Sequence, residues 1–264
     1  MNSYSSKKRS GIVEDESLKI SVIIPAYNSE KTIIECIKSV QMQTYNIFEI
    51  LIYDDCSKDM TVNHLKSLAK RDNRIKIFLG KENKGAGYAR SKLLSAAKGN
   101  IAAFLDSDDL WSREKLEKQV SLLKESNASI VTCGYNILSE GGQVIGHRIP
   151  PKQVRHRMML FSNWLPTSMT IVRLDLHGAR EMPSIRRRQD YAYWLNIFQL
   201  NPGVKCVSSN ELLGTYKRSS ASLSSSNLKN IKSNYAMFRT SLGYSQLMSF
   251  VFVMINGLIR SFRK

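Results

Sequence analysis

The stretch KISVIIPAYNSEKTIIECIKSV, residues 19–40, changes its hydrophobic pattern near its middle. The first part is a continuous apolar run that ends at Pro25, which is typical of a buried strand. The second part has apolar residues at helical spacing, and Ser29 stands where a helix N-cap is expected. The stretch therefore predicts a strand followed directly by a helix, the first half of a βαβ unit.

The same alternation continues along the chain. Further strands are expected at about residues 48–53, 74–80, 100–106 and 128–138, and helices at 61–71, 85–99 and 112–126. Strands that are apolar throughout and alternate with helices are typical of a mostly parallel sheet with helices on both faces. The predicted fold class is therefore α/β with a mostly parallel central sheet.

Beyond about residue 140 the alternation weakens. The segment RRRQDYAYWLNIFQL, residues 186–200, predicts one more helix, and the serine-rich residues 219–227 predict a flexible connection. The apolar side of that helix carries Tyr191, Trp194, Leu195 and Phe198. We therefore expect a disordered segment at 1–18, one domain over 19–220, and a basic amphipathic helical extension over 228–264.

The composition is that of a soluble globular protein, with 42% hydrophobic residues in a chain of 264. The net charge is +17, and residues 148–264 hold 18 Lys and Arg against 4 Asp and Glu. This asymmetry predicts nucleic acid, an anionic membrane face or a phosphate-bearing substrate as a partner. The chain begins with no secretory signal pattern, and its four cysteines form no CxxC pair, so free thiols in a reducing cytoplasm are expected.

Polar residues follow three of the predicted strands at the point where each strand ends. They are Pro25-Ala26-Tyr27, Asp54-Asp55 and Asp106-Ser107-Asp108. In open parallel sheets, ligands bind at the carboxyl ends of the strands. The three clusters are therefore expected to meet at one edge of the sheet and to form a binding site.

The stretch FLDSDDLW, residues 104–111, places Asp106, Asp108 and Asp109 within four positions. Neighbouring carboxylates repel one another unless a cation joins them. Mg²⁺ or Mn²⁺ prefers such oxygen ligands and keeps positions free for phosphate oxygens, so the stretch predicts a metal bridge to a diphosphate. The alternative is that Asp108 or Asp109 only caps the helix that begins near Ser112.

Asp54-Asp55 can accept hydrogen bonds from the imide of a uracil ring or from a ribose hydroxyl, or can form an Asx turn before Ser57. Arg90, in NKGAGYAR (residues 83–90), can reach a diphosphate or orient an aspartate, although an ordinary helix start is the simpler interpretation. Asp190 can be a general base, or only a helix N-terminal acid that interacts with the helix dipole.

Taken together, three stretches resemble the family-2 glycosyltransferases of the GT-A fold. They are SVIIPAYNSEKTIIECIKSVQMQTYNIFEILIYDDCSKDMT (21–61), NKGAGYARSKLLSAAKGNIAAFLDSDDLW (83–111) and QDYAYWL (189–195). Their order and spacing match over about residues 19–220. The resemblance implies a nucleotide-sugar half over about 19–110 and an acceptor half over about 111–220.

The resemblance also implies roles for individual residues. Asp54 and Asp55, with Pro25-Ala26-Tyr27, would hold the nucleoside, and Arg90 would lie in the nucleotide-sugar cleft. Asp106-Ser107-Asp108 matches the DxD element, whose Asp106 and Asp108 would handle ribose, metal (Mn²⁺ or Mg²⁺) and diphosphate. Asp190 would be the catalytic base. The chain departs from the family pattern at Gln189, where Glu is usual, and at Cys56, where Gly is usual.

The implied reaction is an inverting transfer of a hexose from a UDP-sugar to a sugar acceptor on undecaprenyl diphosphate, in bacterial O-antigen or capsule synthesis. The hexose would be glucose or galactose, with or without an N-acetyl group. Acceptor contacts are expected from Gln189 and Trp194, and the acceptor diphosphate is expected to meet Arg186, Arg187 and Arg188.

The stretch LMSFVFVMINGLI, residues 247–259, is short for a membrane span and has basic residues on both sides. It predicts an interfacial helix on an anionic membrane, and hence a peripheral protein at the inner face of the cytoplasmic membrane. The alternative is a C-terminal helix buried against the domain.

Two other function classes are disfavoured. A nucleic-acid-binding protein is disfavoured because carboxylates at the strand ends would repel phosphate. A nucleotidyltransferase acting on sugar phosphates usually has a glycine-rich basic loop after the first strand, where this chain has AYNSEKT (residues 26–32).

Overall fold

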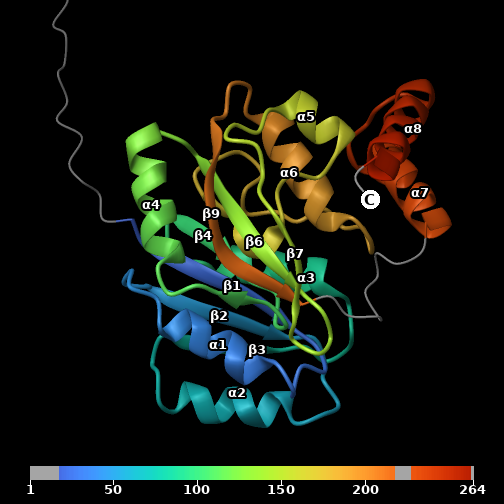
Figure 1. Ribbon diagram of the computed structural model, residues 1–264. Helices are drawn as coiled ribbons and strands as arrows, with labels where there is room; N and C mark the ends of the chain where they lie inside the picture. Colours follow the sequence, from blue (N-terminus) through green and yellow to red (C-terminus); the bar gives the residue numbers. More distant parts are fainter. Residues whose placement is uncertain (1–17, 218–226, 263–264) are drawn as a thin grey trace, which may run out of the picture.

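The computed structural model describes residues 18–217 and 227–262 (Figure 1). The first half alternates strands and helices, as the sequence predicts. Its elements are β1 (Ile20–Ala26), α1 (Ile33–Gln41), β2 (Glu49–Asp54), α2 (Thr61–Ala69), β3 (Ile75–Leu79), α3 (Ala86–Ala96) and β4 (Ile101–Phe104).

The second half is less regular. It contains β5 (Leu110–Trp111), α4 (Lys115–Ser126), β6 (Ile130–Leu138), β7 (Val144–Arg148), α5 (His156–Phe161), the short 3-10 helix η1 (Thr167–Met169), β8 (Ile171–Arg173), α6 (Gln189–Leu200) and β9 (Cys206–Lys217). The C-terminal part consists of α7 (Asn227–Ala236), the π-helical turn η2 (Met237–Ser241) and α8 (Gln246–Phe262). The predicted disordered segment and most of the serine-rich stretch lie outside the described residues.

One sheet of nine strands runs through the domain in the order β3-β2-β1-β4-β8-β6-β9-β5, with β7 paired to β6. The strands from β3 to β4 are parallel, as is the β6–β9 pair, whereas β8 is antiparallel to both of its neighbours. The α/β class is therefore confirmed, and the irregular second half supplies the antiparallel pairs. In the parallel part, Ala26 lies opposite Asp54 and Asp54 opposite Leu79, so the carboxyl ends are level.

Alternate side chains of the parallel strands enter two separate cores, one on each face of the sheet. Ile23 and Phe104 pack with Leu93 of α3 and Trp194 of α6 on one face. On the other face, Val22 and Ile24 of β1 pack with Ile33 of α1 and Leu116 of α4. Helices cover both faces, as the apolar strands predict.

The predicted N-cap of the first helix is wrong. Helix α1 begins at Ile33, and no side chain caps it. The N–H groups of Thr32 and Ile33 donate instead to the backbone carbonyl of Ser29. This leaves the hydroxyl of Ser29 free to contact the loop after β4, where it lies 2.7 Å from Ser107 Oγ.

The C-terminal extension packs beside α5 and α6 at one end of the domain (Figure 1). Across the described part of the chain, no helix combines the length and the apolar character that a membrane crossing requires.

Candidate active site

Three loops at the carboxyl edge of the sheet are tied together by hydrogen bonds. The loop after β1 joins the loop after β2, since Asn28 N donates to Ser57 Oγ (2.9 Å) and Ser29 N donates to Thr61 Oγ1 (2.8 Å). The contact between Ser29 and Ser107 joins the loop after β1 to the loop after β4. The three polar clusters predicted from the sequence are therefore adjacent in space.

Arg90 and Asp106 form an ion pair at the centre of this edge. The guanidinium of Arg90 comes from α3, has a side chain only 6% exposed, and contacts Asp106 Oδ1 through Nη2. Burial opposes the charge of Arg90, but Asp106 and then Asp190 raise its pKa above the usual value. The sequence allowed Arg90 either to reach a diphosphate or to orient an aspartate, and in this structure its side chain pairs with an aspartate.

Asp108 and Asp109 differ sharply in their surroundings. Asp108 is exposed, and within residues 18–217 and 227–262 no ion pair to it is found. Partial desolvation and then the charge of Asp106 raise its pKa. Asp109 is buried, accepts a hydrogen bond from the N–H of Lys217 (3.3 Å), and has a pKa raised well above the usual value by burial and by its two acidic neighbours.

The helix-cap alternative for these aspartates is wrong. Strand β5 intervenes after Asp109, and α4 begins at Lys115 with Glu114 at its N-cap position. The carboxylates of Asp106, Asp108 and Asp109 are therefore not used to cap that helix, and their charges stay close together at the sheet edge.

Asp109→Asn is expected to raise stability at neutral pH. Because the pKa of Asp109 is raised in the folded state, the folded chain holds this proton more tightly than the unfolded chain does. Stability is thus lost as the pH rises from the unfolded pKa through the folded pKa, and asparagine removes this loss. An increase of roughly 1 kcal/mol in the free energy of unfolding corresponds to a gain in Tm of about 2–4 °C at pH 7.5. This gain should become smaller as the pH is lowered.

Thermal unfolding from pH 4 to pH 8 measures this effect. The control is Asp175→Asn, since the Asp175 side chain is 70% exposed and should leave Tm nearly unchanged at every pH. An Asp109→Asn advantage that is constant with pH would contradict the electrostatic explanation.

Asp54 and Asp55 end β2 and are both buried. Asp55 accepts backbone hydrogen bonds from Lys84 N (2.9 Å) and Gly85 N (2.6 Å), and so holds the loop that precedes α3. Asp54 Oδ2 accepts from Ser57 N (3.0 Å), which is the Asx-turn contact, while its buried Oδ1 has no hydrogen-bond partner among the described residues. A buried acceptor without a partner is a position that a ligand N–H or O–H can satisfy.

Pro25 and Ala26 belong to β1, whereas Tyr27 follows it and is 48% exposed. The N–H of Asp55 donates to the carbonyl of Ala26 (2.8 Å), so the ends of β1 and β2 stay in register beyond their last strand pair. Tyr27 is thus an exposed aromatic residue directly after the buried end of β1.

Cys56 has a left-handed backbone, with φ of +66°. This conformation costs a residue with a Cβ atom roughly 1–2 kcal/mol and costs glycine much less, which accounts for the usual glycine at this position. Cys56→Gly is therefore expected to increase the free energy of unfolding by about 0.5–1 kcal/mol, after the larger backbone entropy of glycine in the unfolded chain is subtracted. Urea denaturation of Cys56→Gly beside Cys56→Ala isolates the backbone effect, and equal stabilities of the two variants would refute it.

Asp190 lies in the first turn of α6, close enough to Arg90 to raise the pKa of that guanidinium. Asn163 Nδ2 donates to Asp190 Oδ2 (3.4 Å). The approach of α6 to α3 depends on Gly87, since a Cβ atom there would lie 2.9 Å from Gln189 Cγ. Gln189 therefore packs on α3, and this contact brings Asp190 to the Arg90–Asp106 pair.

The residues predicted to contact an acceptor separate into two groups. Arg186 is exposed, and Arg187 and Arg188 are half-buried just before α6. The buried Nη1 atom of Arg187 finds no hydrogen-bond partner in the described ranges. Trp194 is fully buried and packs edge-on against Phe104 and Tyr193, so its predicted contact with an acceptor is wrong, because its ring fills the core.

The aspartates at the sheet edge could hold a metal ion only together with oxygen atoms of a bound phosphate ligand or water. Within the described ranges, no three His, Cys, Asp or Glu side chains gather to form a metal cage. Mg²⁺ and Mn²⁺ are commonly held by one or two carboxylates, with phosphate oxygens and water completing the shell. Asp108, exposed and with a raised pKa, is the carboxylate available for such an ion, whereas Asp106 is already paired with Arg90.

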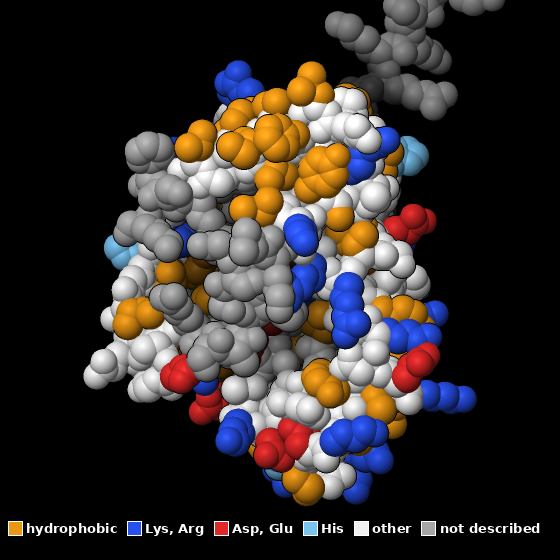
Figure 2. Space-filling view, turned by 90° about the vertical axis from the view of Figure 1, so that its right-hand side faces the viewer, with side chains coloured by type: hydrophobic (Ala, Val, Ile, Leu, Met, Phe, Trp, Pro, Cys, Tyr) orange, Lys and Arg blue, Asp and Glu red, His pale blue; other side chains and the backbone are white. Residues whose placement is uncertain are grey.

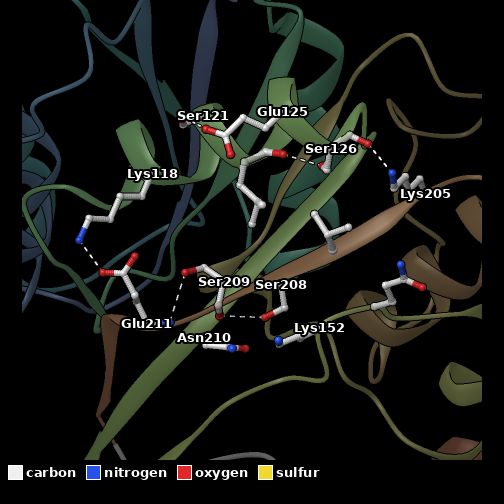
Figure 3. A pocket seen from close by; sticks show the side chains of 13 residues that line it. Lys118, Ser121, Glu125, Ser126, Lys152, Lys205, Ser208, Ser209, Asn210 and Glu211 are labelled. Atoms are coloured by element: carbon white, nitrogen blue, oxygen red, sulfur yellow. Dashed lines mark hydrogen bonds and ion pairs between the residues drawn. The ribbon is translucent and has the colours of Figure 1, made fainter.

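A separate open groove lies between α4 and β9 (Figure 3). Its volume is about 550 Å³, and its lining includes Lys118, Glu125, Lys152, Lys205 and Glu211. Several of these charges are already used, since Lys118 pairs with Glu211 (2.5 Å) and Lys205 Nζ donates to Ser126 O. The candidate site is therefore assigned from the carboxylates at the strand ends and not from this groove.

Two residues of the site were missed by the sequence analysis. Ser168 Oγ accepts a hydrogen bond from Asp106 N (3.0 Å) and also bonds to the Asp109 side chain. Asn163 contacts Asp190. Both lie in the irregular segment between β7 and α6, where no sequence pattern marks them.

Comparison with known proteins identifies related chains. The family model "Glycosyl transferase family 2" matches residues 21–179. The putative teichuronic acid biosynthesis glycosyltransferase TuaG of Bacillus subtilis is 34% identical over 83% of this chain and 87% of its own. The UDP-Glc:alpha-D-GlcNAc-diphosphoundecaprenol beta-1,3-glucosyltransferase WfgD of Escherichia coli is 33% identical over 81% of this chain and 82% of its own.

Among solved structures, TarS of S. aureus in complex with UDP-GlcNAc is similar in fold. Its TM-score is 0.69 at 21% identity, and the match covers 90% of this chain and 71% of that chain. The likeness supports the GT-A fold for this chain.

Proposed function

This chain belongs to glycosyl transferase family 2, and from that premise we propose that it transfers a hexose from a UDP-sugar to a lipid-diphosphate-linked sugar with inversion at the anomeric carbon. The hexose is glucose or galactose, with or without an N-acetyl group. The name of the E. coli relative WfgD, which combines a UDP-glucose donor with an undecaprenyl-diphosphate acceptor, supports both substrates. The product would be a unit of a bacterial surface polysaccharide.

One observation carries the proposal: buried Arg90 pairs with Asp106 of the predicted donor site and is near enough to Asp190 of the predicted acceptor side for that charge to raise its pKa. A transferase needs its leaving-group side and its base on opposite sides of one sugar ring. Residues from α3, from the loop after β4 and from α6, which are far apart in the sequence, would supply these two sides.

At the donor end, Asp54 and Asp55 with Tyr27 hold the nucleoside. The unpartnered Oδ1 of Asp54 accepts the imide N–H of uracil or a ribose hydroxyl. Asp55 fixes the loop at Lys84 and Gly85, and its carboxylate oxygens retain lone pairs for the ligand. Ser107, held by Ser29, borders the ribose and diphosphate.

Asp108, with Asp106 beside it, would hold Mg²⁺ or Mn²⁺ on the diphosphate. Such an ion neutralises the negative charge that grows on the departing nucleoside diphosphate. Arg90 holds the Asp106 carboxylate in place through their ion pair, and adds its own positive charge to the same region.

On the acceptor side, Asp190 takes the proton of the attacking hydroxyl. Asn163 orients its carboxylate through the 3.4 Å hydrogen bond to Oδ2. The hydroxyl oxygen attacks the anomeric carbon from the face opposite the diphosphate, so a single displacement inverts the configuration. No second carboxylate is required as a nucleophile.

Arg186, Arg187 and Arg188 precede the base and would meet the diphosphate of the lipid acceptor. The buried, unpartnered Nη1 of Arg187 is the donor best placed for such an anion in the described part of the chain. The protein would work as a peripheral enzyme at the inner face of the cytoplasmic membrane, where this acceptor lies.

The test is a panel of UDP-, GDP- and dTDP-sugars offered with a prenyl-diphosphate-linked N-acetylglucosamine, with and without Mn²⁺. We expect transfer from one UDP-hexose only, and a product whose linkage, read by NMR, has the inverted anomeric configuration. A product with retained configuration, or transfer from GDP- or dTDP-sugars alone, would contradict the proposal.

A further inference from the structure

Helix α8 presents two opposite faces of different character. One face is buried against the domain through Ser249, Phe252 and Val253. On the same side, Asn256 Nδ2 donates to Leu160 O (2.9 Å) of α5. The helix is therefore held in place by its own contacts, and its position does not depend on a partner.

The opposite face of α8 is apolar and exposed. Its side chains recur at spacings of three and four residues, so they form one stripe along the helix. They are Leu247 (72% exposed), Phe250 (57%), Val251 (38%), Met254 (51%) and Leu258 (57%). Figure 2 shows hydrophobic side chains gathered in its upper part, with Lys and Arg side chains below them.

The charge around this stripe favours an anionic occupant. Residues 246–258 contain no charged residue, while exposed Lys232 in α7 and exposed Arg239 in η2 precede the helix. In the sequence, Arg260, Arg263 and Lys264 follow it. An apolar stripe whose charged neighbours along the chain, Lys232, Arg239 and Arg260, are basic matches an anionic lipid surface.

The size of the stripe disfavours a second copy of the chain. From Leu247 to Leu258 it is about 17 Å long at 1.5 Å per residue, and its five side chains expose roughly 500 Å² of accessible surface. A stable protein interface needs about 800 Å² from each partner. Two copies would also bring together two halves that each carry the basic excess of residues 148–264.

We propose that the exposed face of α8 is a docking surface for an anionic lipid bilayer, on which the helix lies parallel to the membrane plane. The helix also touches the catalytic side, since the hydroxyl of Tyr191, the neighbour of Asp190, lies 3.5 Å from Asn256 Oδ1. Because Asn256 is on the buried face of α8, docking would place the beginning of α6 behind the helix, about 10 Å from the lipid surface. This second step rests on the proposed function, because only that function gives Asp190 an acceptor to meet.

The experiment uses the full chain and sedimentation with vesicles of phosphatidylethanolamine and phosphatidylglycerol (3:1). The variant is Phe250→Ser/Leu258→Ser, which places two hydroxyls in the middle and end of the stripe. The matched control is Val144→Ser/Ile145→Ser in β7. It replaces two apolar side chains of similar exposure, 63% for Val144 and 52% for Ile145, on a different element of the fold. Circular dichroism and Tm verify that all proteins are folded.

We expect the α8 variant to lose vesicle affinity by about 10- to 100-fold and the β7 variant to bind as the wild type does. Binding should be weaker on neutral phosphatidylcholine vesicles and should fall in high salt. Equal binding by the α8 variant and the wild type, or no binding by the wild type, would overturn the proposal. A wild-type dimer that becomes monomeric in the α8 variant would overturn it in favour of a second copy.

A transfer assay separates this inference from the proposed function. With a water-soluble, short-chain acceptor, the α8 variant should keep the wild-type rate, and with acceptor in vesicles its rate should fall together with its binding. Vesicle binding through α8 in a protein that transfers no sugar would leave the docking surface standing and would refute the function.

Discussion

Asp190→Asn is expected to lower kcat by about 10²- to 10⁴-fold, the range that a positioned general base supplies. Asparagine keeps the shape of the side chain but cannot accept the proton of the attacking hydroxyl. Donor binding should stay close to the wild-type level, because Asp190 is in α6 while the proposed nucleoside contacts lie at the ends of β1 and β2. Turnover with saturating donor and acceptor, together with UDP affinity by calorimetry, measures the two quantities separately.

The control for this prediction is Asp175→Asn, which removes an exposed carboxylate paired only loosely with Arg173 (3.6 Å). Its kcat should equal that of the wild type. If Asp190→Asn retained wild-type turnover, the base assignment would fail, and an equal loss of UDP affinity would instead place Asp190 in donor binding.

Asp108→Asn is expected to lower kcat/KM by about 10²- to 10³-fold, because a metal ion stabilises the developing diphosphate charge by several kcal/mol. The variant should need a higher Mn²⁺ concentration for half-maximal rate. Removal of the ion from the wild type with EDTA should produce a loss of similar size, and added Mn²⁺ or Mg²⁺ should restore the rate.

Asp106→Asn separates the two aspartates of the pair. Asp108 is exposed, so its replacement should leave Tm almost unchanged, whereas loss of the Asp106 charge leaves Arg90 buried without its ion-pair partner. Breaking such a pair is strongly destabilising, so a fall in Tm is expected for Asp106→Asn. Full activity of the wild type in excess EDTA would refute the metal site, and equal Tm values for the two variants would refute the distinct role of Asp106.

The sequence predicted the site where its signal is local. Asp54 ends the apolar strand β2, and Asp106 and Asp108 lie in the loop after the apolar strand β4. Because parallel strands end at one edge, their meeting could be expected before any coordinates. The alternation of strands and helices likewise predicted the first half of the sheet. The predictions for Ser29 and Trp194 failed for different reasons. The N–H groups at the start of α1 donate to the backbone carbonyl of Ser29 and not to its side chain, whereas the Trp194 ring fills the core beside Phe104.

The amino-acid sequence by itself determined the α/β class, the family, and the carboxylates at the strand ends, because periodicity and strand ends are properties of neighbouring residues. Only the tertiary structure decided that Arg90 pairs with Asp106, that Gly87 lets α6 bring Asp190 to them, and that α8 leaves one apolar face uncovered. Burial and charge pairing join residues up to about a hundred positions apart, and no local pattern encodes which of them will meet.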